Sequence, residues 1–352
     1  MIKILKIASI ISLLFSIYAK AHYDDAYNHS ESTIIQNRHW MKNLDDQKNI
    51  SMLSIPGTHD SASFYGGDIV QTQSMSIGEQ LNAGVRFLDI RLRHIDDVFA
   101  IHHGPIFQKK FFEDILNQAK SFLVQNPSEF ILMRVQKEHT EKNNTRTFEE
   151  TFLDYVNKYS DIVFIFSENE YFPLVSEVRG KIVFLEQIPT SGIFPPFGIN
   201  YYWFNIQDDY KMYNNWGLYE KWEKIKKHLE DSSSGNKTRT INYLSASGGS
   251  FPYFVASGHS SSGTNAPRLN TGLTTPGWKH LYPDFPRINC FIGMCSIAFE
   301  GTNTLTKNWI INNKPKYTGI VVADFIGIGL INAIINSNFR TEIDNNINDS
   351  ES

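Results

Sequence analysis

The chain has 352 residues, of which 41% are hydrophobic and 20% charged, a composition typical of a globular protein with a substantial core. Its formal net charge of −4 at pH 7 excludes a general electrostatic affinity for nucleic acid, so we expect no nucleic-acid partner. The length suits one domain of barrel size or two smaller domains.

Residues 1–21 have the layout of a secretory signal peptide. Two lysines precede an apolar run over 7–18, and a small-x-small tripeptide follows at 19–21. Because this run is shorter than the ~20 residues that span a bilayer, an uncleaved membrane anchor is the less favoured alternative. We expect a secreted, extracellular chain that starts near His22. Cleavage removes three lysines and no acidic residue, which moves the net charge from −4 to −7.

The rest of the chain is predicted to contain a leader over 22–45, one domain over 46–340 and a disordered acidic tail over 341–352. Short apolar segments alternate with amphipathic ones along the domain, which is typical of parallel βα units. The fold class is therefore α/β, and we predict a single closed (β/α)8 barrel of TIM type. Strands are predicted over 50–55, 85–90, 98–101, 130–135, 162–166, 181–185, 205–208, 240–244 and 319–324, and helices over 76–83, 111–125, 148–159 and 216–230.

Cys290 and Cys295 are the only cysteines in the chain. They could close a six-residue loop as a disulfide in an oxidising compartment, or remain two buried thiols. A tetrahedral metal site needs more ligands than these two residues supply.

Polar side chains follow short apolar strands at four places in the chain. A polar group at the end of a buried strand is the usual source of a barrel active site. The first and last strands of a closed barrel are neighbours, so Asp324 is expected beside His59. The residues at the four places are His59 with Asp60, Asp89 with Arg91, His103, and Asp324.

These residue types suit chemistry at a phosphodiester. A carboxylate bound to one imidazole nitrogen fixes the tautomer and raises the basicity of the other nitrogen. Of two such pairs, one can take a proton from a nucleophile while the other protonates the leaving oxygen. Arg91 between them can bind the charged phosphoryl oxygens.

Three motifs in order, over 56–61 (Pro-Gly-Thr-His-Asp-Ser), 89–91 (Asp-Ile-Arg) and 102–105 (His-His-Gly-Pro), resemble the X-domain signatures of bacterial phosphatidylinositol-specific phospholipases C. The similarity continues to Asp324 and so covers nearly the whole mature chain. This family has a distorted (β/α)8 barrel, and its members cleave phosphatidylinositol in two steps.

The resemblance implies a role for each matching residue. His59, oriented by Asp324, would be the general base on the inositol 2-hydroxyl, whose attack on phosphorus gives diacylglycerol and inositol 1,2-cyclic phosphate. His103, paired with Asp60, would be the general acid toward the glycerol oxygen, and Arg91 would stabilise the phosphoryl charge. The two histidines would exchange roles when water opens the cyclic phosphate.

Arg91 also bears on the question of a metal. In calcium-dependent relatives an acidic residue stands at this position and binds the ion, so the resemblance implies neither a metal nor another cofactor here. Asp89 either holds Arg91 or His59 in place or is purely structural.

Headgroup recognition fits the family less well. Asp208 and Tyr210 match the Asp-x-Tyr that binds and stacks on inositol, but the family's lysine falls at Gln136 and its arginine at Gln187. Lys137 is no obvious replacement, because a shift of one residue along a strand turns the side chain to the other face. Loss of two cationic contacts predicts weaker inositol selectivity or a shifted substrate.

Aromatic stretches over 194–197, 201–204 and 251–254 lie in segments bounded by Gly and Pro. They either touch a lipid surface at the mouth of the barrel or cover its side, and we favour transient contact with a membrane. We expect a monomer.

The leading prediction is a secreted, metal-independent phosphodiesterase for phosphatidylinositol, which could also cleave glycosylphosphatidylinositol anchors. One alternative is a phosphodiesterase for another glycerophospho-headgroup on the same barrel. The other is an inactive X domain used as a lipid-binding module, and the presence of both histidines and Arg91 argues against it.

Overall fold

The computed structural model describes residues 25–166, 172–192 and 196–340. The expected signal peptide and acidic tail lie outside these residues, as do Phe194 and Pro195 of the first aromatic stretch. No helix within the described ranges is long and apolar enough to cross a membrane.

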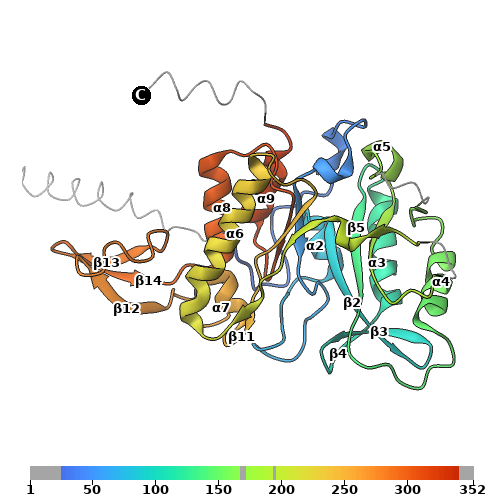
Figure 1. Cartoon of the computed structure of the whole chain (residues 1–352), viewed down its shortest axis with the longest axis horizontal. Coiled ribbons are helices and arrows are strands. Elements are labelled where there is room, and N and C mark those ends of the chain that lie inside the picture. The colour runs from blue at the N-terminus through green and yellow to red at the C-terminus, as the bar shows by residue number, and fades with distance from the viewer. Residues whose placement is uncertain (1–24, 167–171, 193–195, 341–352) are drawn as a thin grey trace, which may run out of the picture.

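A curled sheet of parallel strands forms the centre of the molecule (Figure 1). Its strands follow the order β7-β6-β5-β2-β1-β15-β10-β8, and every pairing along this path is parallel. The α/β barrel class is therefore confirmed. The bounds are β1 (Ile55–Thr58), β2 (Phe87–Ile95), β5 (Ile131–Lys137), β6 (Ile182–Gln187), β7 (Ile199–Asn200), β8 (Asn205–Gln207), β10 (Thr240–Tyr243) and β15 (Ile320–Ala323).

The barrel is open between β7 and β8, so the prediction of full closure is wrong. These two strands stand at the ends of the order, and within the described residues neither pairs with the other. Only residues 201–204, mostly the 3-10 helix η3 (Tyr201–Trp203), connect them. A crossover between neighbouring parallel strands takes a dozen or more residues, so this link is too short to set β8 beside β7.

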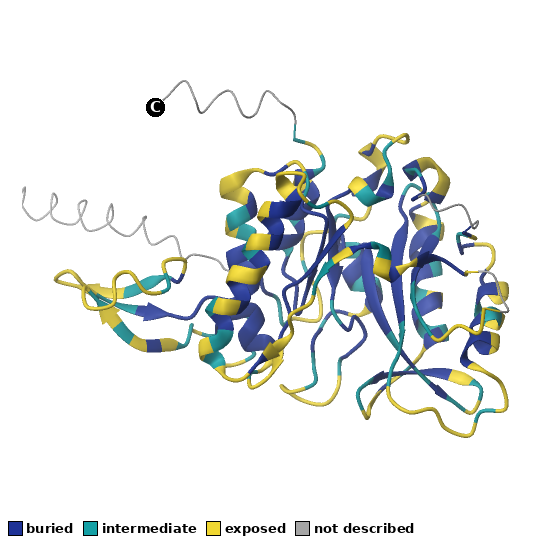
Figure 2. Cartoon of the chain, in the orientation of Figure 1, coloured by how far each residue is buried: buried dark blue, intermediate teal, exposed yellow. Residues whose placement is uncertain are grey.

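Helices cover the outer side of the sheet, and Figure 2 shows them blue toward the strands and yellow toward solvent. The predicted helix over 111–125 is α3 (Phe112–Gln125), and its six predicted apolar positions are all buried. Ser76 caps α2 by accepting a hydrogen bond from the Glu79 amide, as expected for a helix start. The other helices are α2 (Ile77–Ala83), α4 (Phe148–Lys158), α5 (Val175–Val178), α6 (Leu218–Ser233), α7 (Pro252–Ser257), α8 (Thr302–Asn313) and α9 (Ile328–Ser337).

The predicted first strand over 50–55 is wrong in its position. Residues Ile50–Met52 form the 3-10 helix η2, and β1 begins only at Ile55 and continues through Pro56 and Gly57 to Thr58. Gly57 belongs there because β2 approaches closely. A Cβ at this position would lie 2.8 Å from the Phe87 ring, nearer than packed carbon atoms tolerate.

The predicted third strand does not belong to the barrel. β3 (Val98–His103) pairs antiparallel with β2 and then with β4 (Ile106–Phe111), which forms an extension beyond the end of β2. Asp96 and Asp97 both have positive φ, the geometry of a two-residue hairpin turn. The predicted strand over 162–166 is also wrong, because in this segment only Val163 makes an isolated bridge.

A second, three-stranded antiparallel sheet was not predicted. It comprises β12 (Asn270–Thr275), β13 (Arg287–Phe291) and β14 (Met294–Ala298) in the order β12-β14-β13. Figure 1 shows it projecting from the barrel beside α7. We call residues 270–298 the arm. The two cysteines form a disulfide within it, between Cys290 and Cys295.

The pairing of β1 with β15 positions the active site. Thr58 is registered with Ala323, so the next residues, His59 and Asp324, leave adjacent strands at the same level. The leader packs beside these strands. Tyr27 forms a bridge to Ile326, shortly after β15, and the Trp40 indole donates a hydrogen bond to the Gly84 carbonyl, shortly before β2. The first and last strands are thus neighbours, as expected for a barrel.

Candidate active site

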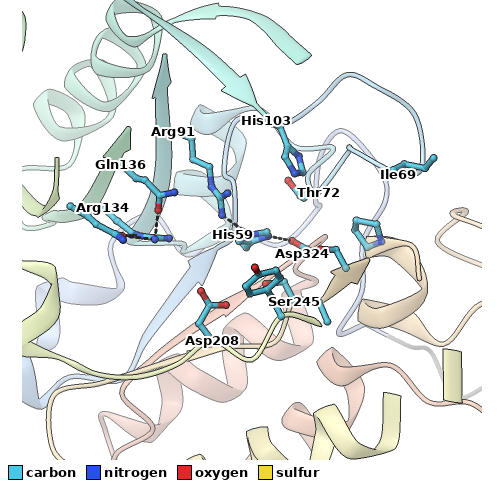
Figure 3. A pocket seen from close by; sticks show the side chains of 15 residues that line it. His59, Ile69, Thr72, Arg91, His103, Arg134, Gln136, Asp208, Ser245 and Asp324 are labelled. Atoms are coloured by element: carbon cyan, nitrogen blue, oxygen red, sulfur yellow. Dashed lines mark hydrogen bonds and ion pairs between the residues drawn. The ribbon is translucent and has the colours of Figure 1, made fainter. Parts of the chain in front are cut away.

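A pocket of about 420 Å³ lies at the carboxyl ends of the parallel strands (Figure 3). It collects residues from nearly the whole described chain, from His59 to Asp324. Eight of the ten residues predicted from the sequence line it: His59, Arg91, His103, Gln136, Gln187, Asp208, Tyr210 and Asp324.

His59 is bound on both ring nitrogens. Its Nδ1 lies 2.8 Å from Asp324 Oδ1, and its Nε2 lies 2.9 Å from a terminal nitrogen of Arg91. A guanidinium can only donate, so Nε2 must be the accepting nitrogen and Nδ1 must carry the proton that Asp324 receives. The geometry therefore defines a neutral imidazole whose basic lone pair faces the arginine.

The surroundings of His59 raise its pKa above the ordinary histidine value. Burial alone lowers the pKa, and the nearby charge of Arg91 lowers it further. The charge and hydrogen bond of Asp324 outweigh both effects, with a smaller contribution from Asp89. His59 is thus a stronger base than a free imidazole.

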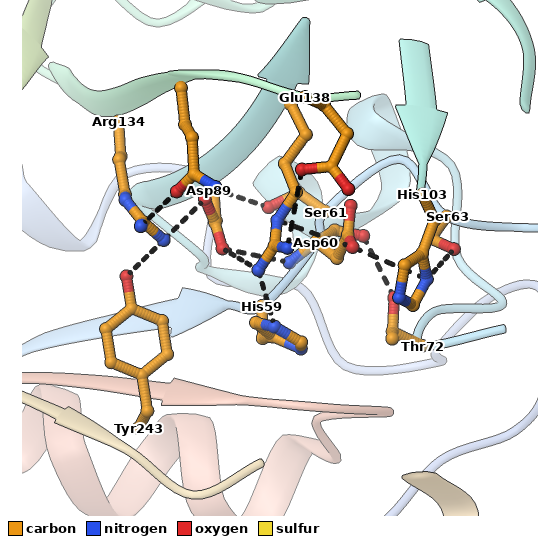
Figure 4. Close-up of polar contacts among 12 residues, drawn as sticks. His59, Asp60, Ser61, Ser63, Thr72, Asp89, His103, Arg134, Glu138 and Tyr243 are labelled. Atoms are coloured by element: carbon orange, nitrogen blue, oxygen red, sulfur yellow. Dashed lines mark hydrogen bonds and ion pairs between the residues drawn. The ribbon is translucent and has the colours of Figure 1, made fainter. Parts of the chain in front are cut away.

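Arg91 lies among three carboxylates, which Figure 4 labels as Asp60, Asp89 and Glu138. Its nitrogens are 3.4 Å from Asp60, 3.5 Å from Asp89 and 3.7 Å from Glu138. These charges raise the pKa of Arg91 despite its burial, so it remains cationic at any pH at which the fold persists. The side chain keeps 17% of its surface exposed in the pocket, which leaves it accessible to an anionic group.

His103 points toward the pocket from the end of β3. Its Nδ1 lies 2.8 Å from the Val70 carbonyl and 3.1 Å from the Ser63 hydroxyl. A carbonyl only accepts, so Nδ1 carries a proton and Nε2 is left for the pocket. Asp60 Oδ2 lies 3.4 Å from the same Nδ1 and equally far from Arg91 Nε, so this carboxylate stands between His103 and Arg91.

Asp60 and Asp89 do not line the pocket. Both are buried, and Asp89 is completely inaccessible. Asp89 therefore has no surface through which to bind substrate, and it fits the expected role of holding Arg91 in place, because this carboxylate lies 3.5 Å from Arg91 and 3.0 Å from Arg134. Burial tends to raise its pKa, but the two guanidinium groups lower it to about 2. Asp89 is a fixed anion that holds two cations apart.

Arg134 is a pocket residue that the sequence analysis missed. Its guanidinium donates to Asp89 at 3.0 Å, to the Tyr243 hydroxyl at 3.1 Å and to Gln187 Oε1 at 2.6 and 2.9 Å, and it also bonds Gln136 Oε1. It stacks over a tyrosine ring as well, with 4.4 Å to the centroid of Tyr201. All five N–H donors are thus engaged by protein.

This network orients the two glutamines of the headgroup wall. Both side-chain oxygens face Arg134, so the amide NH2 groups must point elsewhere. Gln187 donates to the Tyr202 hydroxyl at 2.9 Å, and Gln136 turns its NH2 away from the arginine. Asp208 and Tyr210 complete this side of the pocket. A ligand here meets amide donors and a carboxylate.

The sequence did contain a signal for Arg134. It lies two residues before Gln136 on β5, and alternate residues of a strand share a face. The strand pattern that places Gln136 in the pocket therefore places Arg134 on the same face. Glu138, the next residue on this face, binds the Gly104 amide at 2.7 Å and so connects β5 to the turn after His103.

The prediction that the three aromatic stretches touch a membrane is wrong for most of their described residues. Tyr202 and Phe251 are exposed, whereas the remaining described members are partly or fully buried, and several belong to the core: Phe197, Tyr201, Phe204, Tyr253 and Phe254. These five rings belong to the hydrophobic core, where their burial removes a large apolar surface from water.

A second cavity, of about 800 Å³, opens beside the first on the His103 side. Its wall includes Ile69, Trp216 and Phe251, which are 73%, 46% and 42% exposed. Across the described ranges, no group of three or more His, Cys, Asp or Glu side chains is arranged to hold a metal ion.

A barrel with a buried arginine between two histidine–carboxylate pairs is built for phosphodiester cleavage. Comparison with known proteins identifies the class. The sequence model described as "Phosphatidylinositol-specific phospholipase C, X domain" matches residues 53–187. Together with curated relatives that are more than 30% identical and are covered over at least three quarters of their own length, this match shows that the chain belongs to the phosphatidylinositol-specific phospholipase C family.

Curated relatives and solved structures agree with this assignment. The chain is 32% identical to a 1-phosphatidylinositol phosphodiesterase of Listeria monocytogenes, covering 66% of this chain and 75% of that protein. It is 31% identical to the Staphylococcus aureus protein of that name, over 71% of this chain and 82% of the relative. The structure superposes on the Listeria phosphatidylinositol-specific phospholipase C with a TM-score of 0.62 and 25% identity, covering 86% and 99% of the two chains.

Because the pKa of His59 is raised, we expect kcat/KM to depend on pH. Only the neutral imidazole can accept a proton, so kcat/KM of the native protein should fall as the pH drops through a value above about 6.5. Asp324→Asn removes the charge that raises this pKa, so the acid limb should move to lower pH. The rate should also fall at least about 100-fold, because an amide favours the wrong tautomer.

The check is a pH–rate profile of both proteins. Asp154→Asn, on the exposed face of α4, is the matched control and should leave the profile unchanged. An acid limb that stays in place in Asp324→Asn would mean that another group titrates.

We expect the buried Arg134–Asp89 pair to contribute to the free energy of unfolding. Arg134→Met leaves a buried carboxylate with one cation fewer and should lower the free energy of unfolding by about 3 kcal/mol. Because the folded-state pKa of Asp89 is about 2, this contribution is present above pH 4 and is lost as the pH falls toward 2.

Urea unfolding at pH 7 and pH 3 measures both effects. Arg146→Met, which breaks an exposed pair with Asp154, is the control and should change stability by less than about 0.5 kcal/mol. Equal losses in the two variants would show that Arg134 makes no special contribution.

Proposed function

We propose that this protein is a phosphatidylinositol-specific phospholipase C that cleaves its substrate without a metal ion. The observation that carries the proposal is Arg91, which contacts the basic nitrogen of His59 and lies within 3.4 Å of the carboxylate that faces His103. A phosphate bound to this arginine lies between a base and an acid. In-line displacement at phosphorus requires that arrangement.

In the first step, His59 Nε2 takes the proton of the inositol 2-hydroxyl, and the resulting alkoxide oxygen attacks phosphorus. Asp324 accepts the hydrogen bond from Nδ1 and stabilises the imidazolium that forms. The bond to the glycerol oxygen breaks as His103 Nε2 donates a proton to it. The products are inositol 1,2-cyclic phosphate and diacylglycerol.

In the second step, the roles of the histidines reverse. His103 takes a proton from water, which attacks the cyclic phosphate, and His59 returns its proton to the 2-oxygen. Arg91 stabilises the phosphoryl oxygens in both steps, where negative charge builds up. Asp60 stabilises the imidazolium of His103 before the first step, and again once His103 has taken a proton from water in the second.

Headgroup binding is assigned to the wall opposite His103. We propose that Asp208 accepts hydrogen bonds from inositol hydroxyls, that Tyr210 covers the ring and that Gln136 donates through its amide NH2. Arg134 acts as a positioning residue, since its own donors are all occupied. Because the donors of Arg134 are occupied, this wall suits an uncharged inositol ring better than an inositol ring that carries further phosphate groups.

Metal independence is supported by the cation already present. Arg91 lies where charge would otherwise be supplied by a bound ion, and the carboxylates near it are engaged with it. We also propose that the protein is secreted, because residues 1–21 have a signal-peptide layout and because its substrate is a membrane lipid. A structure of the Staphylococcus aureus relative concerns modulation of that enzyme's membrane binding.

The experiment is product analysis with purified protein, phosphatidylinositol in mixed micelles, and excess EDTA. We expect diacylglycerol and inositol 1,2-cyclic phosphate as the first products, at a rate unaffected by the chelator. His59→Ala should reduce this rate at least about 1,000-fold.

The outcome also separates the alternative functions. If another glycerophospholipid is cleaved and phosphatidylinositol is not, the protein is a phosphodiesterase for a different headgroup. Gln136 and Gln187, which replace two cationic residues of the family, are the reason to consider this alternative. An unaltered rate in His59→Ala, or no turnover of any phosphodiester, would contradict the proposed mechanism.

A further inference from the structure

The arm ends in an exposed apolar loop. Residues 290–295 connect β13 to β14, and three of the four residues between the cysteines are large and hydrophobic. Phe291, Ile292 and Met294 are 70%, 82% and 56% exposed. A soluble protein rarely concentrates such side chains at the end of a projection unless they meet a partner.

The backbone holds these side chains outward. Phe291 pairs with Met294 across the hairpin, and the disulfide closes the loop behind them. Ile292 adopts φ 45° and Gly293 φ 77°. A β-branched residue in the left-handed region costs free energy, and a turn normally places Asn or Gly there. A loop that served only as a turn would therefore be more stable with Asn or Gly than with isoleucine at this position.

The root of the arm is joined to the mouth of the active site. Trp216, which lines the cavity beside His103, lies 5.5 Å from the Phe299 ring and 6.3 Å from the Tyr282 ring. The aromatic contacts continue inward from Tyr282 to Tyr219 and Phe285. A chain of aromatic contacts thus connects the wall of the cavity next to the proposed acid to the root of the arm.

The charge of the arm differs from that of the whole chain. Its only acidic residue, Asp284, is bound by Tyr219, Trp222 and Lys226 at the root. Beside the exposed Trp278, the arm presents Lys279 and His280, which are also exposed. In an otherwise acidic chain, the arm therefore combines an apolar loop with exposed basic residues, which complements a surface of anionic lipid.

We propose that the arm is a membrane-docking element whose loop, residues 290–295, inserts into a bilayer that contains anionic lipid. The side chains of Phe291, Ile292 and Met294 enter the apolar layer, while Lys279 meets the headgroups. Docking holds the mouth of the barrel at the surface where the lipid substrate lies. This role rests on the proposed function only in that the substrate is a membrane lipid.

The test compares vesicle binding with turnover of a soluble substrate. The variant is Phe291→Ser with Ile292→Ser, and Val124→Ser is the control, because Val124 is 69% exposed on α3. Sedimentation with vesicles of phosphatidylcholine and phosphatidylglycerol in equal amounts measures binding. The double variant should bind at least about tenfold more weakly, while the control binds as the native protein does.

Hydrolysis of inositol 1,2-cyclic phosphate, which requires no membrane, should be the same in all three proteins. Binding of the double variant at the native level would overturn the proposal. The proposal would also be overturned if the loop served for dimerisation. In that case sedimentation velocity would show a dimeric native protein and a monomeric double variant, while the two proteins bound vesicles equally. Loss of vesicle binding together with absence of any phosphodiesterase activity in the native protein would support the arm and refute the proposed function.

Discussion

A guanidinium enclosed by three carboxylates and an imidazole is the interaction on which the catalytic end of this barrel depends. Arg91 touches His59 directly and reaches His103 through Asp60. Its charge offsets the mutual repulsion of the Asp60, Asp89 and Glu138 carboxylates, which lie 3.4, 3.5 and 3.7 Å from its nitrogens. The same cation is the group that a phosphate would approach, so the stability of the site and its chemistry rely on one side chain.

The topology brings the partners of this arginine together from distant parts of the chain. Pairing of the first and last parallel strands sets Asp324 against His59. The antiparallel extension of β2 brings His103 back over the pocket from outside the barrel. The opening between β7 and β8 lies near Tyr201, whose ring packs against Arg134 on the headgroup side.

Much of this could be predicted from the sequence, because the signals are local. The alternation of apolar segments indicated the parallel sheet, and the six apolar positions of α3 fall at helical spacing. His59, Arg91 and Asp324 were recognisable because each directly ends or lies within a strand. The pairing of His59 with Asp324 followed from the neighbourhood of first and last strands alone.

The missed features depend on contacts between segments far apart in the chain. The position of Arg134 is explained by acceptors on β2, β6 and β10, none of which is near it in sequence. Asp89 has the spacing of a pocket residue, yet it is covered by the two arginines that it binds. Aromatic residues such as Phe204 and Phe254 look like surface loops in sequence, and only packing shows that they fill the core.

The two histidines are proposed to act on different oxygens, and a change of leaving group distinguishes their roles. An inositol phosphodiester with p-nitrophenol as leaving group needs no proton on the departing oxygen, whereas phosphatidylinositol does. The account predicts that His103→Ala is strongly impaired toward the lipid and recovers by at least about 100-fold toward the nitrophenyl ester, while His59→Ala is impaired toward both. Equal recovery of the two variants, or recovery of His59→Ala alone, would contradict it.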